Sequence, residues 1–296
     1  MSVRLKSAVL SLVVVASGCS VATADPPAES RVRAASVTDV PLPGEEARKL
    51  AVPFDAYNFS PAEIMTIEAA QDLLIRDCMR GQGMEWKLSP LPAQADIEPQ
   101  NRRRYGVIEP QIARSFGYHA PLDRPSVARY NAERDDQLTE LSPAARAAYG
   151  DSAKDADGCS DKAQAHLLKD APEVSASLFN TLVRQTFEES QRDGDVVRVF
   201  RDWSACMKKK GFDYPDPLAA ITDDRWMNNQ RPSHQEIMAA ETDVWCKKKG
   251  DLVSIWAATE KRIQEDAILT HAAYFQALET HKERQLGAVR RVLSRG

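Results

Sequence analysis

The chain has 296 residues, enough for one large domain or two small ones, and 28% of them are charged. Acidic residues outnumber basic ones by 43 to 39, which gives a net charge of −4 at pH 7. This balance argues against a general nucleic-acid binder, because such a protein needs a basic surface to neutralise phosphates.

The first 18 residues have the pattern of a secretory signal peptide. Arg4 and Lys6 precede an apolar run from Ser7 to Ala16, which is too short to span a bilayer as a stable helix. Removal of residues 1–18 takes away these two basic residues and changes the net charge from −4 to −6.

Small residues lead directly to a cysteine in the run Ala16-Ser17-Gly18-Cys19. This run resembles the lipobox of bacterial lipoproteins, in which the cysteine receives a diacylglyceryl group and becomes the new N-terminus. Ala16 departs from the family pattern, which usually has Leu there. The resemblance implies that a lipid on Cys19 attaches the protein to the extracytoplasmic face of the membrane. The alternative is plain cleavage at Ala22-Thr23-Ala24, which would release a soluble protein.

A tether is predicted for residues 19–52, because prolines and small polar residues are scattered along this stretch without a helical period. A helical body is expected over residues 53–296. Its first helix begins at Ser60, which can cap the helix while Glu63 reaches back to the cap, and it ends near Gly83.

Residues 87–125 contain six prolines and are expected to be irregular. Apolar residues at helical spacing predict further helices over residues 126–140, 142–149, 158–169, 172–190, 195–210 and 233–250, followed by one long helix over residues 251–294. Strand signals are nearly absent, so the predicted fold class is all-α. The last helix would be roughly 65 Å long. It is therefore expected either to fold back onto the body, with a kink near Gly287, or to project and offer a surface to a partner.

A near-repeat relates two parts of the chain, because Cys78–Trp86 aligns without gaps on Cys206–Tyr214. The Cys, the Met and the second Gly are identical, and basic, apolar, acidic and aromatic positions match by type. The alignment predicts two related helical units, at about residues 60–170 and 195–250. A helix stop explains the motif, with Gly83 and Gly211 in the left-handed conformation and the apolar residue after each in contact with the preceding Met. A binding role for the motif is the alternative.

Five cysteines leave one thiol over in an oxidising compartment, and acylation of Cys19 would remove the odd one. Three pairings of the remaining four are possible, and one disulfide per unit favours Cys78–Cys159 with Cys206–Cys246. Closing loops of this length would add about 4 kcal/mol each by the chain-entropy estimate.

Sequence motifs for metal sites, nucleophilic hydrolysis and phosphate-binding loops are missing. The chain has no C-x2-C, H-E-x-x-H, G-x-S-x-G, S-x-x-K or Walker A spacing, and its five histidines form no i, i+4 pair. We therefore predict no catalytic residue, no metal ligand and no cofactor.

Tryptophan and arginine side chains supply the candidate ligand surface. Trp226 lies in a proline-flanked stretch and is expected to be exposed, together with Arg102, Arg103 and Arg104 in the irregular segment. Trp203 and Trp245 lie close to cysteines and are expected in the disulfide-linked core.

The lipobox, the helices and the Cys-Met-basic-x-x-Gly turn together resemble a family of secreted lipoproteins of high-GC Gram-positive (actinobacterial) bacteria, over roughly residues 53–290. The resemblance implies no activity, but it implies that the protein is located at the outer face of the cytoplasmic membrane. We expect a non-enzymatic, membrane-tethered binding or accessory protein of the cell envelope, with a membrane or cell-wall protein as its partner. The alternative is a cell-wall glycan or small-ligand binder that uses Trp226 and residues 87–125. A cell-wall hydrolase is the less favoured third possibility.

Overall fold

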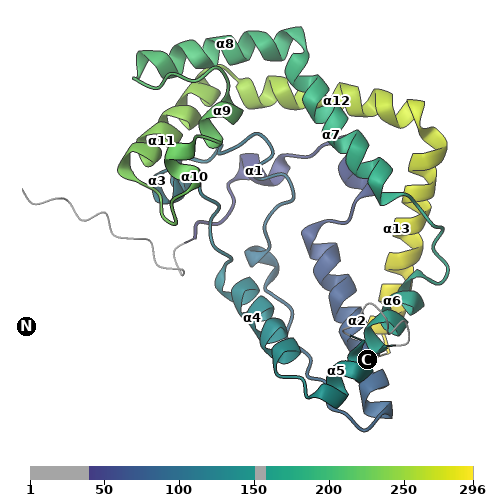
Figure 1. Cartoon of the computed structure of the whole chain (residues 1–296). Coiled ribbons are helices and arrows are strands. Elements are labelled where there is room, and N and C mark those ends of the chain that lie inside the picture. Colours follow the sequence, from purple (N-terminus) through teal and green to yellow (C-terminus); the bar gives the residue numbers. More distant parts are fainter. Residues whose placement is uncertain (1–39, 151–157, 296) are drawn as a thin grey trace, which may run out of the picture. The chain divides into compact units, whose positions relative to one another are not determined.

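The computed structural model describes residues 40–150 and 158–295, all of which belong to one compact unit, Ala35–Gly296. Helices joined by irregular segments make up these residues, with no strand among them, which confirms the all-α class (Figure 1). The predicted signal peptide, Cys19 and the first part of the tether, residues 19–39, lie outside the described residues.

The ordered body begins earlier than predicted. Residues 40–52 were expected to belong to the tether, but they contain α1 (Glu45–Lys49), and Ala47 of this helix is fully buried in the main core. Val52 is also buried, and it leads into the short 3-10 helix η2 (Pro53–Tyr57). A helix of little more than one turn shows no periodicity in the sequence, which explains why the tether prediction is wrong for residues 40–52.

Two helices begin at the predicted capping boxes. In α2 (Pro61–Gly81) the Ser60 hydroxyl accepts a hydrogen bond from the Glu63 N–H at 3.3 Å, while the Glu63 carboxylate accepts one from the Ser60 N–H at 2.8 Å. Ser233 and Glu236 exchange the same bonds at the start of α11 (His234–Lys249). Five further helices lie close to their expected bounds: α4 (Pro125–Thr139), α5 (Pro143–Tyr149), α6 (Cys159–Leu168), α7 (Ala176–Arg192) and α8 (Gly194–Lys209).

Besides α1 and η2, four further short elements were not predicted: η3 (Gln94–Asp96), α3 (Pro110–Phe116), α9 (Pro217–Ile221) and α10 (Asp224–Met227). The segment around α3 packs inside the body rather than on its surface, because Tyr105, Ile112 and Tyr118 are buried in the main core. Helix α3 lies against α11. The proline-rich stretch is therefore a structural part of the core.

Both copies of the near-repeat end their helices in a Schellman motif. After α2, the Met84 N–H donates to the Met79 carbonyl at 2.9 Å and the Gly83 N–H donates to the Arg80 carbonyl at 3.0 Å, with Gly83 at φ +74°. After α8, Gly211 and Phe212 make the equivalent bonds at 3.1 Å each, with Gly211 at φ +92°. Met84 and Phe212 pack against the clusters that hold Met79 and Met207, as predicted.

The predicted helix over residues 251–294 consists of two helices, α12 (Leu252–Thr270) and the long C-terminal helix α13 (Ala272–Leu293). The break lies at His271, and Gly287 sits inside α13 without interrupting it. Helix α12 packs on α7 and α8 while α13 packs on α2 and α6, so this region folds back onto the body (Figure 1).

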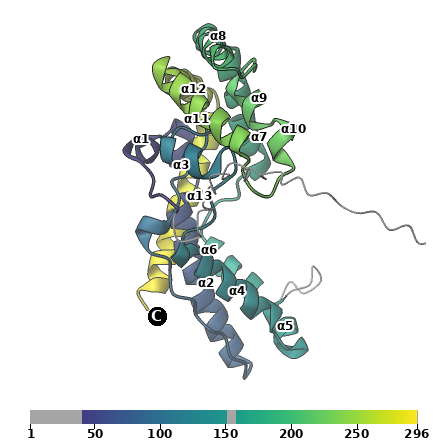
Figure 2. The same ribbon diagram turned by 90° about the vertical axis from the view of Figure 1, so that its left-hand side faces the viewer.

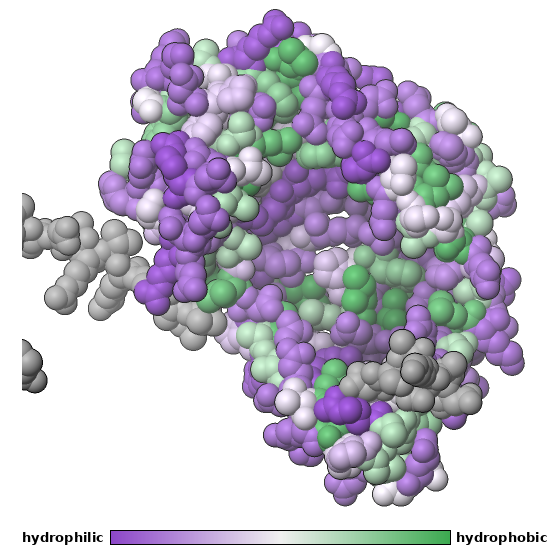
Figure 3. All heavy atoms as spheres, viewed as in Figure 1, coloured by the Kyte–Doolittle hydropathy of each residue, from purple (hydrophilic) through white to green (hydrophobic). Residues whose placement is uncertain are grey.

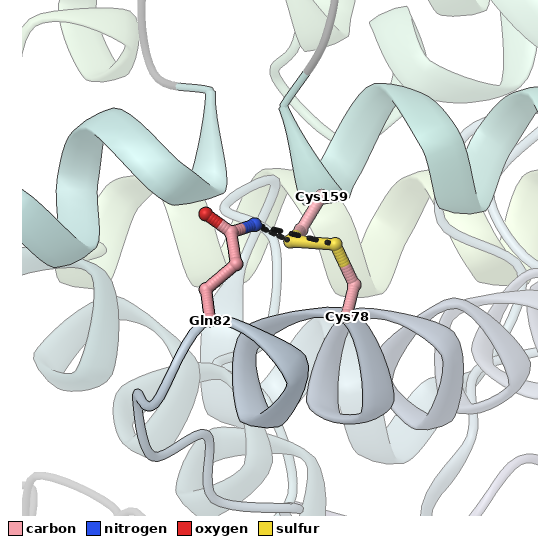
Figure 4. The surroundings of a disulfide bond; sticks show 3 residues. All are labelled: Cys78, Gln82 and Cys159. Atoms are coloured by element: carbon pink, nitrogen blue, oxygen red, sulfur yellow. Dashed lines mark hydrogen bonds between the residues drawn. A yellow bond between two sulfur atoms is a disulfide. The ribbon is translucent and has the colours of Figure 1, made fainter.

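Both predicted disulfides are present. Cys78–Cys159 joins α2 to the start of α6, where the Gln82 side-chain amide donates to the Cys159 sulfur at 3.2 Å (Figure 4). Cys206–Cys246 joins α8 to α11. The second cysteine of each pair occupies a different place, at the start of α6 but near the end of α11. The two units thus share the helix stop but not the position of the second cysteine within its helix, and an ancient duplication stays a prediction.

The described residues form one large hydrophobic cluster and three smaller ones. The large cluster lies among α3, α8, α11 and α12, at one end of the unit in Figure 2. The smaller clusters lie along α2, α6, α7 and α13. The large cluster includes Cys246, and Cys206 packs against it, so this core and the second disulfide form one structural unit.

Replacement of Gly83 by Ala should lower the free energy of unfolding by about 1–2 kcal/mol, because a residue with a Cβ is strained at this positive φ. No heavy atom lies within 4 Å of the added Cβ, so the cost is conformational and not steric. The matched control is Gly81→Ala in the last turn of α2, which also meets open space and should raise stability by about 0.5–1 kcal/mol. Urea denaturation measures both variants, and changes of the same sign would contradict the helix-stop assignment.

Candidate functional site

Trp226 is buried, with 2% of its surface exposed, so the expectation of an exposed ring is wrong. Its indole stacks on Tyr118 at 5.4 Å between ring centroids, and its Nε1 donates to the Ala220 carbonyl at 3.0 Å. The Arg225 guanidinium covers the ring at 5.0 Å. Prolines near Trp226 indicated a loop, but the short helices α9 and α10 turn this side chain inward.

The three arginines of the predicted ligand surface make internal contacts. Arg102 pairs with Glu98 and Glu109, at 2.8 and 2.5 Å. Arg103 donates to the carbonyls of Tyr118 and His119, at 2.6 and 3.1 Å, and Arg104 pairs with the buried Glu260 of α12. These side chains join the irregular segment to its neighbours and do not form the predicted ligand surface with Trp226.

An ion pair in the main core fixes the rotation of α11. The Lys247 ammonium lies 2.9 Å from the Asp243 carboxylate, and the two side chains are 1% and 0% exposed. The carboxylate also accepts a hydrogen bond from Trp203 Nε1 at 2.9 Å, and Lys247 donates to the Val107 carbonyl at 3.0 Å. Burial raises the pKa of the Asp243 carboxyl, while the bonds from Lys247 and Trp203 favour its ionised form. Both charged groups point into the core.

Trp245 lies between Asp243 and Lys247 in sequence, but its side chain points away from the core. Positions two apart on an α-helix point about 200° from one another, so inward Asp243 and Lys247 turn Trp245 outward. Trp245 is 49% exposed, and the prediction that it lies in the core is wrong. Trp203 is buried as predicted.

A pocket of about 340 Å³ is lined by the second disulfide and by the exposed Trp245; we call it the Trp245 pocket. Its walls come from the C-terminal ends of α8 and α11. The lining residues are Asp202, Trp203, Ala205, Cys206, Lys209, Lys210, Trp245, Cys246, Lys249 and Gly250.

Three exposed lysines give the Trp245 pocket its charge. The ammonium groups of Lys210 and Lys249 each lie 5.1 Å from the centroid of the Trp245 ring, within cation–π range. Neither these two nor Lys209 forms an ion pair with an acidic residue in the part of the chain that the structure describes. The pocket is therefore locally positive in a chain whose net charge is −4.

Basic residues at a helix C-terminus also stabilise that helix end, because they offset the partial negative charge of its free carbonyls. This effect accounts for the lysines in the last turns of α8 and α11 taken separately. It does not account for a half-exposed indole between the two ends. An aromatic face beside unpaired cations is an arrangement that can hold a ligand with a negative group and a ring or apolar face.

The sequence of α11 contains a signal for this site. Asp243 and Lys247 have the i, i+4 spacing of an ion pair, and Trp245 with Lys249 repeats that spacing two positions later. The two pairs must occupy opposite faces of α11. Which face is buried depends on contacts with α8 and with residues before α3, which are distant in sequence.

A second buried carboxylate, Glu236, organises the start of α11. It accepts hydrogen bonds from the Tyr118 N–H at 2.8 Å and from His119 Nδ1 at 2.7 Å, while His119 Nε2 lies 2.7 Å from the Asn229 carbonyl. Both ring nitrogens face acceptors, so the imidazolium form fits the site. Burial opposes this charge, but the bonds to Asn229 and Glu236 outweigh it and raise the pKa of His119.

Lys247→Met should lower the free energy of unfolding by about 3–5 kcal/mol, because it leaves the Asp243 carboxylate buried without its counter-ion. Lys248→Met is the matched control, since this neighbouring ammonium is half exposed and lies 3.7 Å from Glu46. Its effect should stay within about 0.5 kcal/mol. Guanidinium denaturation at neutral pH compares the two, and a small loss for both would disprove the role of the buried pair.

The raised pKa of His119 makes stability depend on pH. A group with a raised pKa in the folded state contributes fully below its unfolded pKa of about 6.5, and the contribution is lost as pH rises through the folded value. The native chain should therefore lose stability relative to His119→Gln as the pH increases from 6 to 8. His234→Gln, at an exposed position, should follow the native curve. Parallel curves for the native chain and His119→Gln would show that His119 does not titrate as described.

Three structural findings bear on the site. Over residues 40–150 and 158–295, no group of three or more His, Cys, Asp or Glu side chains is placed to hold a metal ion. No helix among the described elements is long and apolar enough to cross a membrane. Hydrophilic side chains cover most of the face shown in Figure 3.

Protein-family models, curated proteins and solved structures give no match to this chain.

Proposed function

We propose that this chain is a non-enzymatic binding or accessory protein of the cell envelope and that the Trp245 pocket is its ligand-binding face. One observation carries the proposal: a half-exposed indole lies between lysines that have no acidic partner among the described residues. A ligand with a negative group would gain charge-assisted hydrogen bonds from the lysines and would not have to displace an existing carboxylate. The ligand is therefore an anion.

The proposed location is the extracytoplasmic face of the membrane, where a lipid on Cys19 holds the protein. The signal-like residues 1–18 and the small residues before Cys19 support this location. The two disulfides support it independently, because such bonds form and persist mainly in oxidising compartments outside the cytoplasm. Two or three acyl chains on one cysteine would be a firm anchor.

The expected partner is a membrane or cell-wall protein, and a glycan or small ligand is the alternative. The Trp245 pocket favours a ligand of either class that presents negative charge. The glycan alternative relied on Trp226, which is buried. If the protein binds a glycan, the exposed Trp245 is the ring that can stack on it. No observation on the described residues favours the cell-wall hydrolase.

Cross-linking and co-purification of the full-length protein from its own membranes tests both parts of the proposal. The native chain should fractionate with membranes and retain its ligand, and Cys19→Ala should move it to the soluble fraction. Trp245→Ala should stay with membranes and lose most of the captured ligand. Leu269→Ala removes another exposed apolar side chain, on α12, and should behave as the native chain.

The two parts of the proposal can fail separately. If as much of the Cys19→Ala variant as of the native chain fractionated with membranes, the lipid anchor would be contradicted. Undiminished capture by Trp245→Ala would contradict the assignment of the pocket.

A further inference from the structure

We infer that the ligand of the Trp245 pocket is an acidic saccharide, a sugar ring that carries a carboxylate or phosphate group, an inference that rests on the proposed function. The lining of the pocket, which comes from α8 and α11 and their C-terminal ends, offers three kinds of group: an aromatic face, ammonium groups and one carboxylate. Each kind matches one part of such a ligand.

Trp245 supplies the face on which a sugar ring can stack. The ring of an aromatic side chain carries negative charge on its face and attracts polarised C–H groups and cations. The ammonium groups of Lys210 and Lys249 lie 5.1 Å from the centroid of this ring. An incoming anionic group would draw these flexible side chains toward itself, which leaves the indole face to the sugar.

Lys209, Lys210 and Lys249 supply the charge for the anionic group. They come from two helix ends that the disulfide Cys206–Cys246 joins, so three cations lie around one small volume. None is engaged by a carboxylate of the described chain, and an anion would not compete with an internal ion pair. Ammonium groups suit this role because they act as point charges toward carboxylate and phosphate alike.

Asp202 distinguishes a saccharide from a bare anion. This carboxylate lies in the same lining and would repel inorganic phosphate or an anionic bilayer, but it can accept hydrogen bonds from sugar hydroxyls. The pocket volume of about 340 Å³ is at the lower end of the range for small-ligand sites. A membrane-inserting surface would need several apolar side chains, and Trp245 and Ala205 are the exposed ones in this lining.

Calorimetric titration of the detergent-solubilised full-length protein tests the ligand class. The probes are a uronic-acid tetrasaccharide, a phosphorylated mannose oligosaccharide, the matching neutral oligosaccharides, inorganic polyphosphate, adenosine monophosphate and phosphatidylglycerol vesicles. At least one acidic saccharide should bind about tenfold more tightly than its neutral counterpart, and affinity should fall as salt is added. It should also bind more tightly than polyphosphate, nucleotide or vesicles.

Variants locate the binding. Trp245→Ala and the triple change of Lys209, Lys210 and Lys249 to Gln should each weaken acidic-saccharide binding by about tenfold or more. Trp245→Phe should retain binding, which separates loss of the aromatic face from loss of folding. Asp202→Asn should reduce the preference for acidic saccharide over polyphosphate. The matched control replaces the exposed Lys87, Lys162 and Lys169 by Gln and should leave binding unchanged.

Each remaining outcome overturns the inference. Equal or tighter binding of polyphosphate, nucleotide or vesicles through Trp245 would assign a different ligand and leave the proposed function in place. Acidic-saccharide binding that is insensitive to Trp245→Ala and to the lysine changes would place the site elsewhere. Absence of binding by every probe would overturn the saccharide assignment, and if Trp245→Ala also left membrane capture unchanged, the proposed function would fail with it.

Discussion

The larger core depends on a buried ion pair between Asp243 and Lys247 of α11. Side chains of these types are almost never fully buried unless they are paired, because removal of a charge from water costs several kcal/mol. Trp203 of α8 and the Val107 carbonyl before α3 each add a further hydrogen bond to the pair. Apolar contacts are not directional and would accept several rotations of α11, whereas this network accepts one.

The same rotation creates the candidate binding face. With Asp243 and Lys247 inward, Trp245 and Lys249 point away from the core, and the bridge from Cys206 to Cys246 brings the basic end of α8 beside them. Two helices that end in lysines for local electrostatic reasons thereby surround one aromatic ring. Stability and the candidate site therefore share one helix, with structural groups on its inner face and candidate ligand groups on its outer face.

Local signals in the sequence predicted much of the fold. The capping boxes at Ser60 and Ser233, the left-handed stop after α2 and the cysteine pairing depend on neighbouring residues or on the near-repeat, and the structure has all of them. The candidate site was not predictable in the same way. Trp245 adjoins Cys246, but adjacent helical positions point about 100° apart, so proximity in sequence does not give burial. The prediction for Trp226 was wrong in the opposite sense: the side chain was expected to be exposed but is buried. Helices as short as α9 and α10 show no periodicity in the sequence that would indicate their buried side.

Fluorine NMR of the protein labelled with 5-fluorotryptophan tests the central claim most directly, since the chain has five tryptophans in different environments. Substitutions assign each signal, and an acidic saccharide is then titrated into the sample. The account predicts that the Trp245 signal moves with saturation, while the signals of the buried Trp226 and Trp256, which do not line the pocket, keep their positions. Saturable binding that moves another tryptophan signal and leaves that of Trp245 unchanged would contradict the account.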